Sequence, residues 1–286
     1  MEESDLADPK RQGQIEDYTT APHFSTFRMT LSTPFQRLTS DAALLRIAHS
    51  IHLFITDLAD WYSTGRTPDQ LDPFDLQKHA SLLIYRLFDW YQTGEESELI
   101  GGLGRNATDK SICLAHLILM VVATEPHVQS FGSRLSKIVV KLRKALQRTS
   151  LSTWAMSPDL FLWILTMGAL GAKGLPCSQR SCASEFAFFV QYAHLAFSPN
   201  EQAGYTTSHD LLRQIQRCPW ISSVFDARVR RLWAQMGLCV PDAVDMYESS
   251  SEEEEGLVDD EHAVGQSTTA RFFPAMKAGG MKMSPR

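Results

Sequence analysis

The sequence is poor in cysteine, and its cysteines lack the close pairs that hold a structural metal ion. Five cysteines are scattered along the chain, at Cys113, Cys177, Cys182, Cys218 and Cys239. A structural zinc site usually contains Cys-x-x-Cys pairs, and none occurs here. Cys177 and Cys182 lie five residues apart with His194 further along, and we favour free thiols over metal ligands for this set. The sequence therefore predicts reduced thiols, with no metal and no cofactor.

Motifs for nucleophilic catalysis and phosphate binding are also missing. The chain has no GxSxG segment and no cysteine in a recognisable Cys/His context. The segment from Gly101 to Gly104 lacks the Lys-Ser/Thr pair of a phosphate-binding loop, which favours a flexible loop. His49 and His52 are three residues apart without an HExxH motif, so we expect them to face solvent. We therefore expect no catalytic residue and no enzymatic activity.

Long apolar runs are absent, and so is a secretory leader in this sequence. The longest uncharged apolar runs, Ile112 to Ala123 and Leu160 to Ala172, fall short of the ~18 residues that suggest a membrane span. The first 18 residues are polar, which argues against a signal peptide. We expect an intracellular protein without a membrane partner.

Charge is distributed unevenly along the chain. The net charge is −6, but residues 242–262 alone hold ten acidic residues and no Lys or Arg. Residues 1–241 hold 23 acidic and 23 basic residues, so the body of the protein is neutral. A neutral body does not attract the phosphate backbone, so we expect no direct specific DNA binding.

Helical periodicity dominates residues 39–241. Apolar residues recur at steps of three and four, and no run alternates long enough to favour a sheet. Expected helices cover about 39–64, 74–93, 108–124, 128–148, 157–172, 184–197, 208–218 and 224–236. The predicted fold is all-α, a single domain of about eight helices. An extended or flexible arm is expected over residues 1–38, and a disordered acidic tail over residues 242–286.

The segment from Trp154 to Ala172 predicts the centre of this domain. Ser157, Pro158 and Asp159 form a helix start signal, and the residues after them are apolar on every side. A helix without a polar face must be covered by other helices. The segment indicates an architecture and no chemistry.

The helix expected near 128–148 has two contrasting faces. One face carries a basic stripe, Arg134, Lys137, Lys141, Lys144 and Arg148, and the other is apolar, with Phe131, Leu135, Ile138, Leu142 and Leu146. A solvated cationic face is the favoured interpretation. The functional alternative is a docking surface for an acidic partner, including the tail of this same protein.

The acidic tail also has more than one interpretation. Ser249 is followed three residues later by Glu252, a context that acidophilic kinases accept. Leu257 and Val258 would be the hydrophobic contacts of an acidic activation-type segment. A tail that only improves solubility is favoured over both.

Several segments together resemble the helical regulatory region of fungal zinc-cluster transcription factors. They are SICLAHLILMVVATEP, LSKIVVKLRKAL, SPDLFLWILTMGALGA and DLLRQIQRCPWISSVFDARVRRLWAQMG, within residues 111–237. The resemblance implies a regulatory module that acts through a protein partner, an effector or a homodimer. It also implies a nuclear location, in place of a cytoplasmic one.

The six-cysteine DNA-binding cluster of that family has no counterpart here. Residues 1–112 contain no cysteine, so no residue inherits its role. A relative that lost the cluster and an incomplete gene model both fit this departure.

A second function class stays open, an all-helical small-molecule-binding protein or enzyme with an apolar pocket. Trp61, Trp90 and Trp163 are the aromatic residues that would line such a pocket. Core packing of the three tryptophans is the favoured interpretation.

Overall fold

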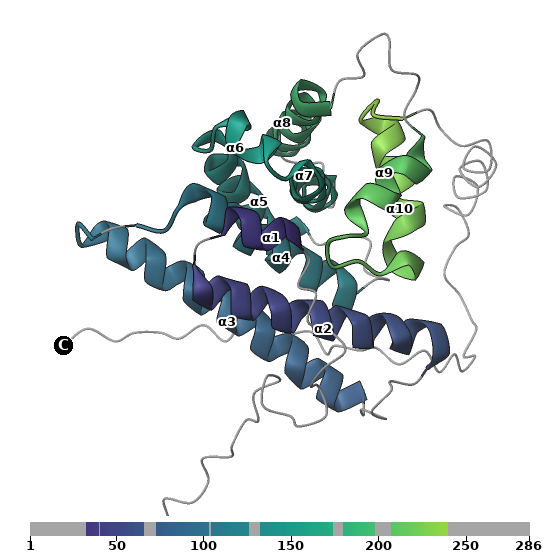
Figure 1. Cartoon of the computed structure of the whole chain (residues 1–286), viewed down its shortest axis with the longest axis horizontal. Coiled ribbons are helices and arrows are strands. Elements are labelled where there is room, and N and C mark those ends of the chain that lie inside the picture. The colour runs from purple at the N-terminus through teal and green to yellow at the C-terminus, as the bar shows by residue number, and fades with distance from the viewer. Residues whose placement is uncertain are drawn as a thin grey trace, which may run out of the picture.

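The regular structure of the described chain is helical throughout. The computed structural model describes residues 33–39, 41–65, 73–102, 104–125, 132–173, 180–197 and 207–239. Its helices are α1 (Thr33–Leu38), α2 (Ala42–Thr64), α3 (Pro73–Leu99), α4 (Ala107–Thr124), α5 (Gly132–Gln147), α6 (Leu151–Ala155), α7 (Pro158–Lys173), α8 (Arg180–Phe197), α9 (Ser208–Ile215) and α10 (Ser222–Gln235) (Figure 1). The all-α prediction is confirmed. The expected disordered tail at 242–286 lies outside the described residues.

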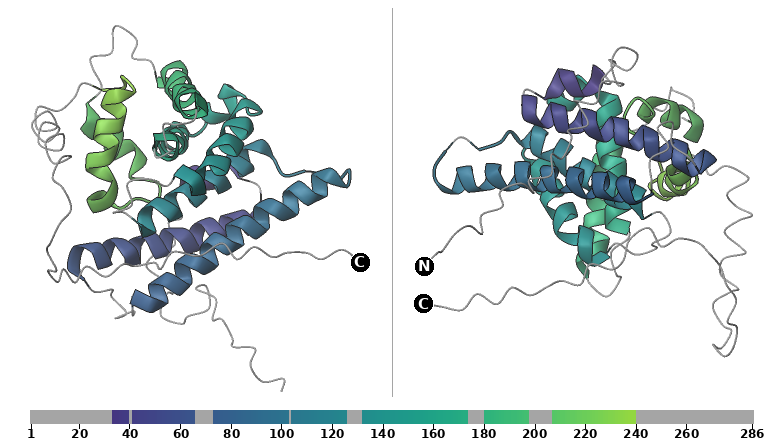
Figure 2. Two further views of the ribbon diagram at one scale, coloured as in Figure 1. Left: turned by 180° about the vertical axis from the view of Figure 1, so that it is seen from behind. Right: turned by 90° about the horizontal axis from the view of Figure 1, so that it is seen from below.

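Helices α4 and α7 form the core of the bundle. Every residue from Thr108 to Met120 in α4 and from Leu160 to Ala169 in α7 is buried. Helices α2, α3 and α5 pack against α4, and α1, α5, α6, α8, α9 and α10 pack against α7 (Figures 1 and 2). The two central helices also contact each other. The prediction that the apolar helix after Ser157 lies at the buried centre of the domain is therefore confirmed.

The helix ends follow local capping chemistry. The Asp41 side chain accepts hydrogen bonds from the backbone N–H groups of Ala43 and Leu44, at 2.8 and 3.0 Å, and so caps α2. Gly65 ends the same helix with a φ of 68°, a conformation that glycine adopts without strain. These two residues explain why α2 begins and ends close to the limits expected from its sequence.

Three boundaries differ from the sequence prediction. The last six residues of the expected arm form α1, because Phe35 is buried beside the rings of His116 and Trp163. Helix α3 continues through Gly94 to Leu99, beyond the expected end near residue 93. Helix α8 begins at Arg180, four residues before the expected start at residue 184. In the described residues, α1 and α6 are the short helices beyond the eight expected.

Two helices are long and apolar enough to cross a membrane by length and composition alone. They are α2 and α4, and 50% and 89% of their apolar windows are buried inside the fold. The core helix of a bundle passes the same test, so these helices are weak evidence for a membrane span. For α4, its place between four other helices accounts for its apolar composition.

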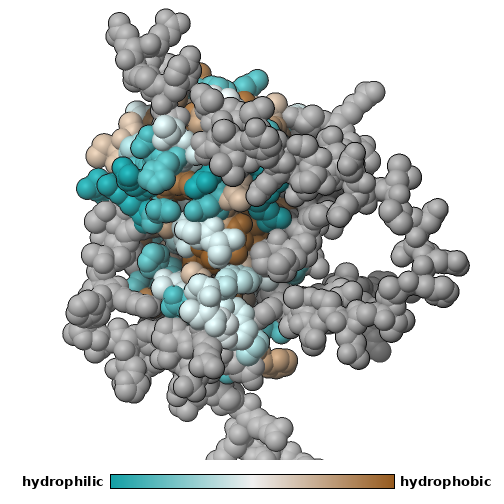
Figure 3. All heavy atoms as spheres, turned by 90° about the vertical axis from the view of Figure 1, so that its right-hand side faces the viewer, coloured by the Kyte–Doolittle hydropathy of each residue, from teal (hydrophilic) through white to brown (hydrophobic). Residues whose placement is uncertain are grey.

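Polar residues cover much of the coloured surface on one face of the molecule. Figure 3 shows the side at the right of Figure 1, where α9 and α10 lie, with apolar residues in patches between polar ones. A mixed surface of this kind is ordinary for a folded protein and marks no site by itself.

Helices α7 and α8 approach each other closely at Gly168. A Cβ atom added at Gly168 would lie 2.2 Å from Cε1 of Phe189, which is too close for any real contact. The absence of a side chain at Gly168 therefore makes room for the buried Phe189 ring. The contact is a close fit of the kind that core substitutions disturb.

We expect the substitution Gly168→Ala to lower the free energy of unfolding by about 1–3 kcal/mol, because the added methyl group displaces Phe189. Phe189→Leu makes space for that methyl group, so the double variant is expected to be more stable than the sum of the two single effects. Urea denaturation of the three variants measures this coupling. Strictly additive effects would contradict the close approach.

Candidate functional site

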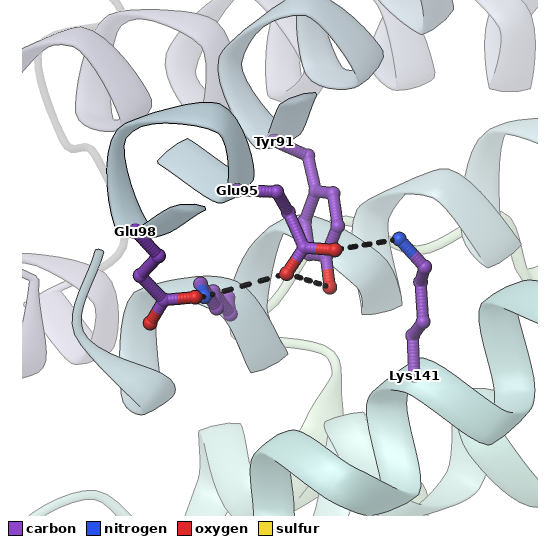
Figure 4. Close-up of polar contacts among 5 residues, drawn as sticks. Tyr91, Glu95, Glu98 and Lys141 are labelled. Carbon is purple, nitrogen blue, oxygen red and sulfur yellow. Dashed lines mark hydrogen bonds and ion pairs between the residues drawn. The ribbon is translucent and has the colours of Figure 1, made fainter. Parts of the chain in front are cut away.

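A network of charged side chains joins α3, α4 and α5. Its members, called here the α3–α4–α5 network, are Tyr91, Glu95, Glu98, Lys110 and Lys141 (Figure 4). The Lys110 ammonium is almost fully buried, with its side chain 5% exposed, and lies 2.7 Å from Oε2 of Glu98 and 3.5 Å from Oε1 of Glu95. Lys110 is thus held by two carboxylates of the preceding helix, which compensate for the burial of its charge.

Lys141 binds the same carboxylate from the other side. Its Nζ atom lies 2.9 Å from Oε2 of Glu95 and 4.5 Å from the centroid of the Tyr91 ring. The Tyr91 hydroxyl donates to Oε1 of Glu95 at 3.3 Å, so Glu95 accepts bonds from three elements of the fold (Figure 4). This arrangement ties the C-terminal half of α3 to the helix that carries the basic stripe.

The electrostatics of the network favour a structural role over proton transfer. Partial burial raises the pKa of the Glu95 carboxyl, but Lys141 and Lys110 outweigh it and hold the pKa below its usual range. Burial, and then the charge of Glu95, raise the pKa of the Tyr91 hydroxyl. The two carboxylates face two ammonium groups, and the pKa values of Glu95 and Tyr91 both move away from neutral pH, so neither of these two groups is poised for proton transfer there.

A second ionic cluster lies at the N-terminal ends of α2 and α4. Arg105 forms an ion pair with Asp41, and its guanidinium lies 4.5 Å from the centroid of the Trp90 ring. A Cβ atom at Gly94 would lie 2.2 Å from Cγ of Arg105, so the arginine crosses α3 where that helix has no side chain. This contact explains why α3 contains Gly94 without ending there.

Asp109 is the least satisfied carboxyl of this cluster. It is buried in the first turn of α4, and its Oδ1 atom has no hydrogen-bond partner among the described residues. Burial, with the nearby charge of Asp41, raises the pKa of Asp109 to about 6. The negative charge of Asp109 is therefore costly in the folded protein above that pH.

The predicted basic stripe divides into exposed and engaged residues. Lys137 and Lys144 are exposed on α5, and Arg148 is exposed in the turn that directly follows it. Lys141 shares their side of the helix, but its ammonium binds Glu95, a residue 46 positions earlier in the chain. The side chain of Arg134 lies outside the described residues. All four described members of the stripe are therefore exposed, and one of them, Lys141, also belongs to the network.

Sequence reasoning did not single out a second group of cations, on α7 and α10. The Lys173 ammonium donates to Oε1 of Gln235 at 2.7 Å. Burial, followed by the charges of Arg231 and Arg228, lowers the pKa of Lys173, and burial with Arg231 lowers the pKa of Arg228. Lys173 and Arg228 are 55 positions apart, so no local pattern in the sequence connects them.

The remaining histidine and cysteine candidates do not form a metal site within the described ranges. No group of three or more His, Cys, Asp or Glu there has metal-binding geometry. His49 and His52 are half-buried, in contrast to the solvent-facing histidines expected. Burial lowers the pKa of His116 to about 4, so that core histidine is neutral at physiological pH. Cys113 and Cys218 are buried free thiols, Cys239 is half-buried, and Cys177 and Cys182 lie outside the described side chains.

The three tryptophans considered for a pocket have different surroundings. Trp90 lies beside Arg105, and Trp163 packs with Phe35 and His116 and donates to the backbone oxygen of Pro219 at 3.3 Å. Trp61 is partly buried near the end of α2. These contacts are those of core packing and do not favour a shared ligand pocket.

Comparisons with known proteins identify no relative of this chain. No model of a protein family matches it, and neither a curated protein nor a solved structure matches it. The resemblance to fungal regulatory regions therefore stays a prediction.

We expect Asp109→Asn to stabilise the protein at neutral pH but not near pH 4. Because the folded pKa of about 6 lies above the ordinary 3.8, the wild type loses stability as pH rises between these values. Asparagine does not ionise, so its advantage in unfolding free energy is expected to grow to about 3 kcal/mol above that range. Urea denaturation of both proteins across the range measures the difference, and a difference independent of pH would contradict the raised pKa.

Proposed function

We propose that this chain is a non-enzymatic helical module that regulates transcription by binding another protein. The proposal adopts the resemblance to the regulatory region of fungal zinc-cluster transcription factors. The all-α fold supports it, since the residues that carry the resemblance include the two buried helices α4 and α7. Residues 1–112 contain no cysteine, so the proposed module has no zinc cluster in this chain. Nuclear location follows from the resemblance alone.

The observation that carries the proposal is the basic face of α5, defined here as Lys137, Lys144 and Arg148. Lys137 and Lys144 are seven residues apart and share one side of the helix, about 10 Å apart along its axis, and Arg148 directly follows the helix in a turn. In the described part of the chain none of the three forms an ion pair with a carboxylate. Leu135, Leu142 and Leu146 are fully buried on the inner side of α5 and hold the basic face in a fixed orientation.

The chemistry that fits this face is an acidic protein segment. No acidic residue occurs between Pro126 and Pro158, so the field of the helix is not cancelled by its neighbours in sequence. Complementary charge raises association rates and selects partners more than it adds affinity. Residues 249–262 of this chain, with seven acidic residues, have the same chemistry and serve as a probe.

We expect the substitutions Lys137→Glu and Lys144→Glu together to weaken binding of a labelled peptide with the sequence of residues 249–262 by about tenfold or more. The protein for this test is the full chain with Glu252 to Glu255 replaced by glutamine, so that its own tail competes less. Fluorescence anisotropy at low and high salt measures the binding, and salt is expected to weaken it.

A matched control carries the same change of charge on other surfaces. Arg46 and Arg213 are exposed on α2 and α9, and their replacement by glutamate is expected to leave peptide binding nearly unchanged. Equal losses for both pairs would show a dependence on net charge alone. Tight binding of a specific DNA duplex in the presence of a chelator, without peptide binding, would overturn the proposal.

A further inference from the structure

Helix α3 carries large apolar side chains on its outward side. Phe74 is 63% exposed, Tyr85 66%, Phe88 39% and Leu99 87%, and Ile100 directly after the helix is 85% exposed. On the inner side, Leu76, Leu83 and Leu87 are buried against the bundle. The inner face of α3 is already packed, so packing within the chain does not account for the exposed aromatic and aliphatic groups on its other side.

The exposed residues follow one stripe along the helix. The α3 outer stripe is defined here as Phe74, Lys78, Ser81, Tyr85, Phe88, Gln92, Glu96 and Leu99, at steps of three and four residues. The 27 residues of α3 extend over about 40 Å. In Figures 1 and 2 the helix lies along the outer edge of the bundle, and it packs against α2 and α4.

The charges on the stripe are ordered along its length. Lys78 stands near the start and Glu96 near the end. If two copies of the stripe run in opposite directions, Phe74 of each lies opposite Leu99 of the other, Lys78 opposite Glu96, and Tyr85 opposite Phe88. A parallel arrangement would place Lys78 opposite Lys78 and Glu96 opposite Glu96, which like-charge repulsion disfavours.

We propose that two copies of this chain associate through antiparallel pairing of their α3 outer stripes. The interface is self-complementary about a two-fold axis near residues 86 and 87, as a closed dimer requires. Tyr85 and Phe88 supply rigid aromatic contacts at its centre, where large side chains contribute most to binding. At each end of the interface, Phe74 of one copy contacts Leu99 and Ile100 of the other.

The internal ion pair of Lys78, near the start of the stripe, is weak. Lys78 contacts Asp75 at 3.3 Å and lies 5.2 Å from the Phe74 ring centroid, but both ionic side chains are exposed, and such pairs contribute little. At the other end, Glu95 and Glu98 bind Lys110 and so anchor α3 to the bundle. This dimer uses α3 and does not depend on the basic face of α5.

The charge pair gives a direct test on the full chain. Lys78→Glu alone and Glu96→Lys alone are each expected to weaken self-association about tenfold. Each change places like charges opposite each other, and the two-fold axis makes this repulsion occur twice in the dimer. The double variant Lys78→Glu, Glu96→Lys restores both pairs and is expected to dimerise like the wild type. Sedimentation velocity over a range of concentrations measures each dissociation constant.

Two further samples separate this interface from other modes of association. An equimolar mixture of the two single variants is expected to form heterodimers as tight as the wild type. Tyr85→Asp is expected to abolish the dimer, while Leu195→Asp, at an α8 residue that is 68% exposed, leaves it intact. A wild type that stays monomeric up to its solubility limit, or a double variant as weak as the single ones, would overturn the proposal.

Discussion

Helices α4 and α7 have almost no side that can face water, and the rest of the fold is arranged to cover them. Burial removes apolar surface from water and supplies most of the driving force for folding. Eight surrounding helices each contact one or both of these two, including short α1 and α6, which are too small to be stable alone. Along the chain, the helices before, between and after α4 and α7 thus cover these two apolar helices.

The same constraint explains where the polar interactions lie. A buried charge on α4 needs partners of opposite charge, and Lys110 forms ion pairs with two carboxylates of the preceding helix. The α3–α4–α5 network and the Asp41–Arg105 pair therefore hold the covering helices to the core at the start of α4. One carboxylate oxygen of Asp109 has no hydrogen-bond partner among the described residues, and burial raises the pKa of this carboxyl.

With the interior occupied by packed side chains, the proposed functions depend on the outer surfaces of the covering helices. The basic face of α5 and the outer stripe of α3 have different chemistry, one cationic and one aromatic. Lys141 and Glu95 connect the two helices at a single ion pair. Both helices pack against α4, which fixes the relative orientation of the two surfaces, so a dimer formed through α3 would present two basic faces in a defined geometry.

The sequence alone determined the helical class, the buried identity of Leu160 to Ala169, and the two faces of α5. Each of these is a pattern within one helix, where apolar residues recur at the helical period. Tertiary structure decided what depends on distant residues. Gly94 leaves room for Arg105 to cross α3, Phe35 packs α1 against the core, and Lys141 is bound by Glu95. The exposure of Tyr85 and Phe88 also belongs to this second group, because periodicity identifies the residues that share a face but not which face another helix covers.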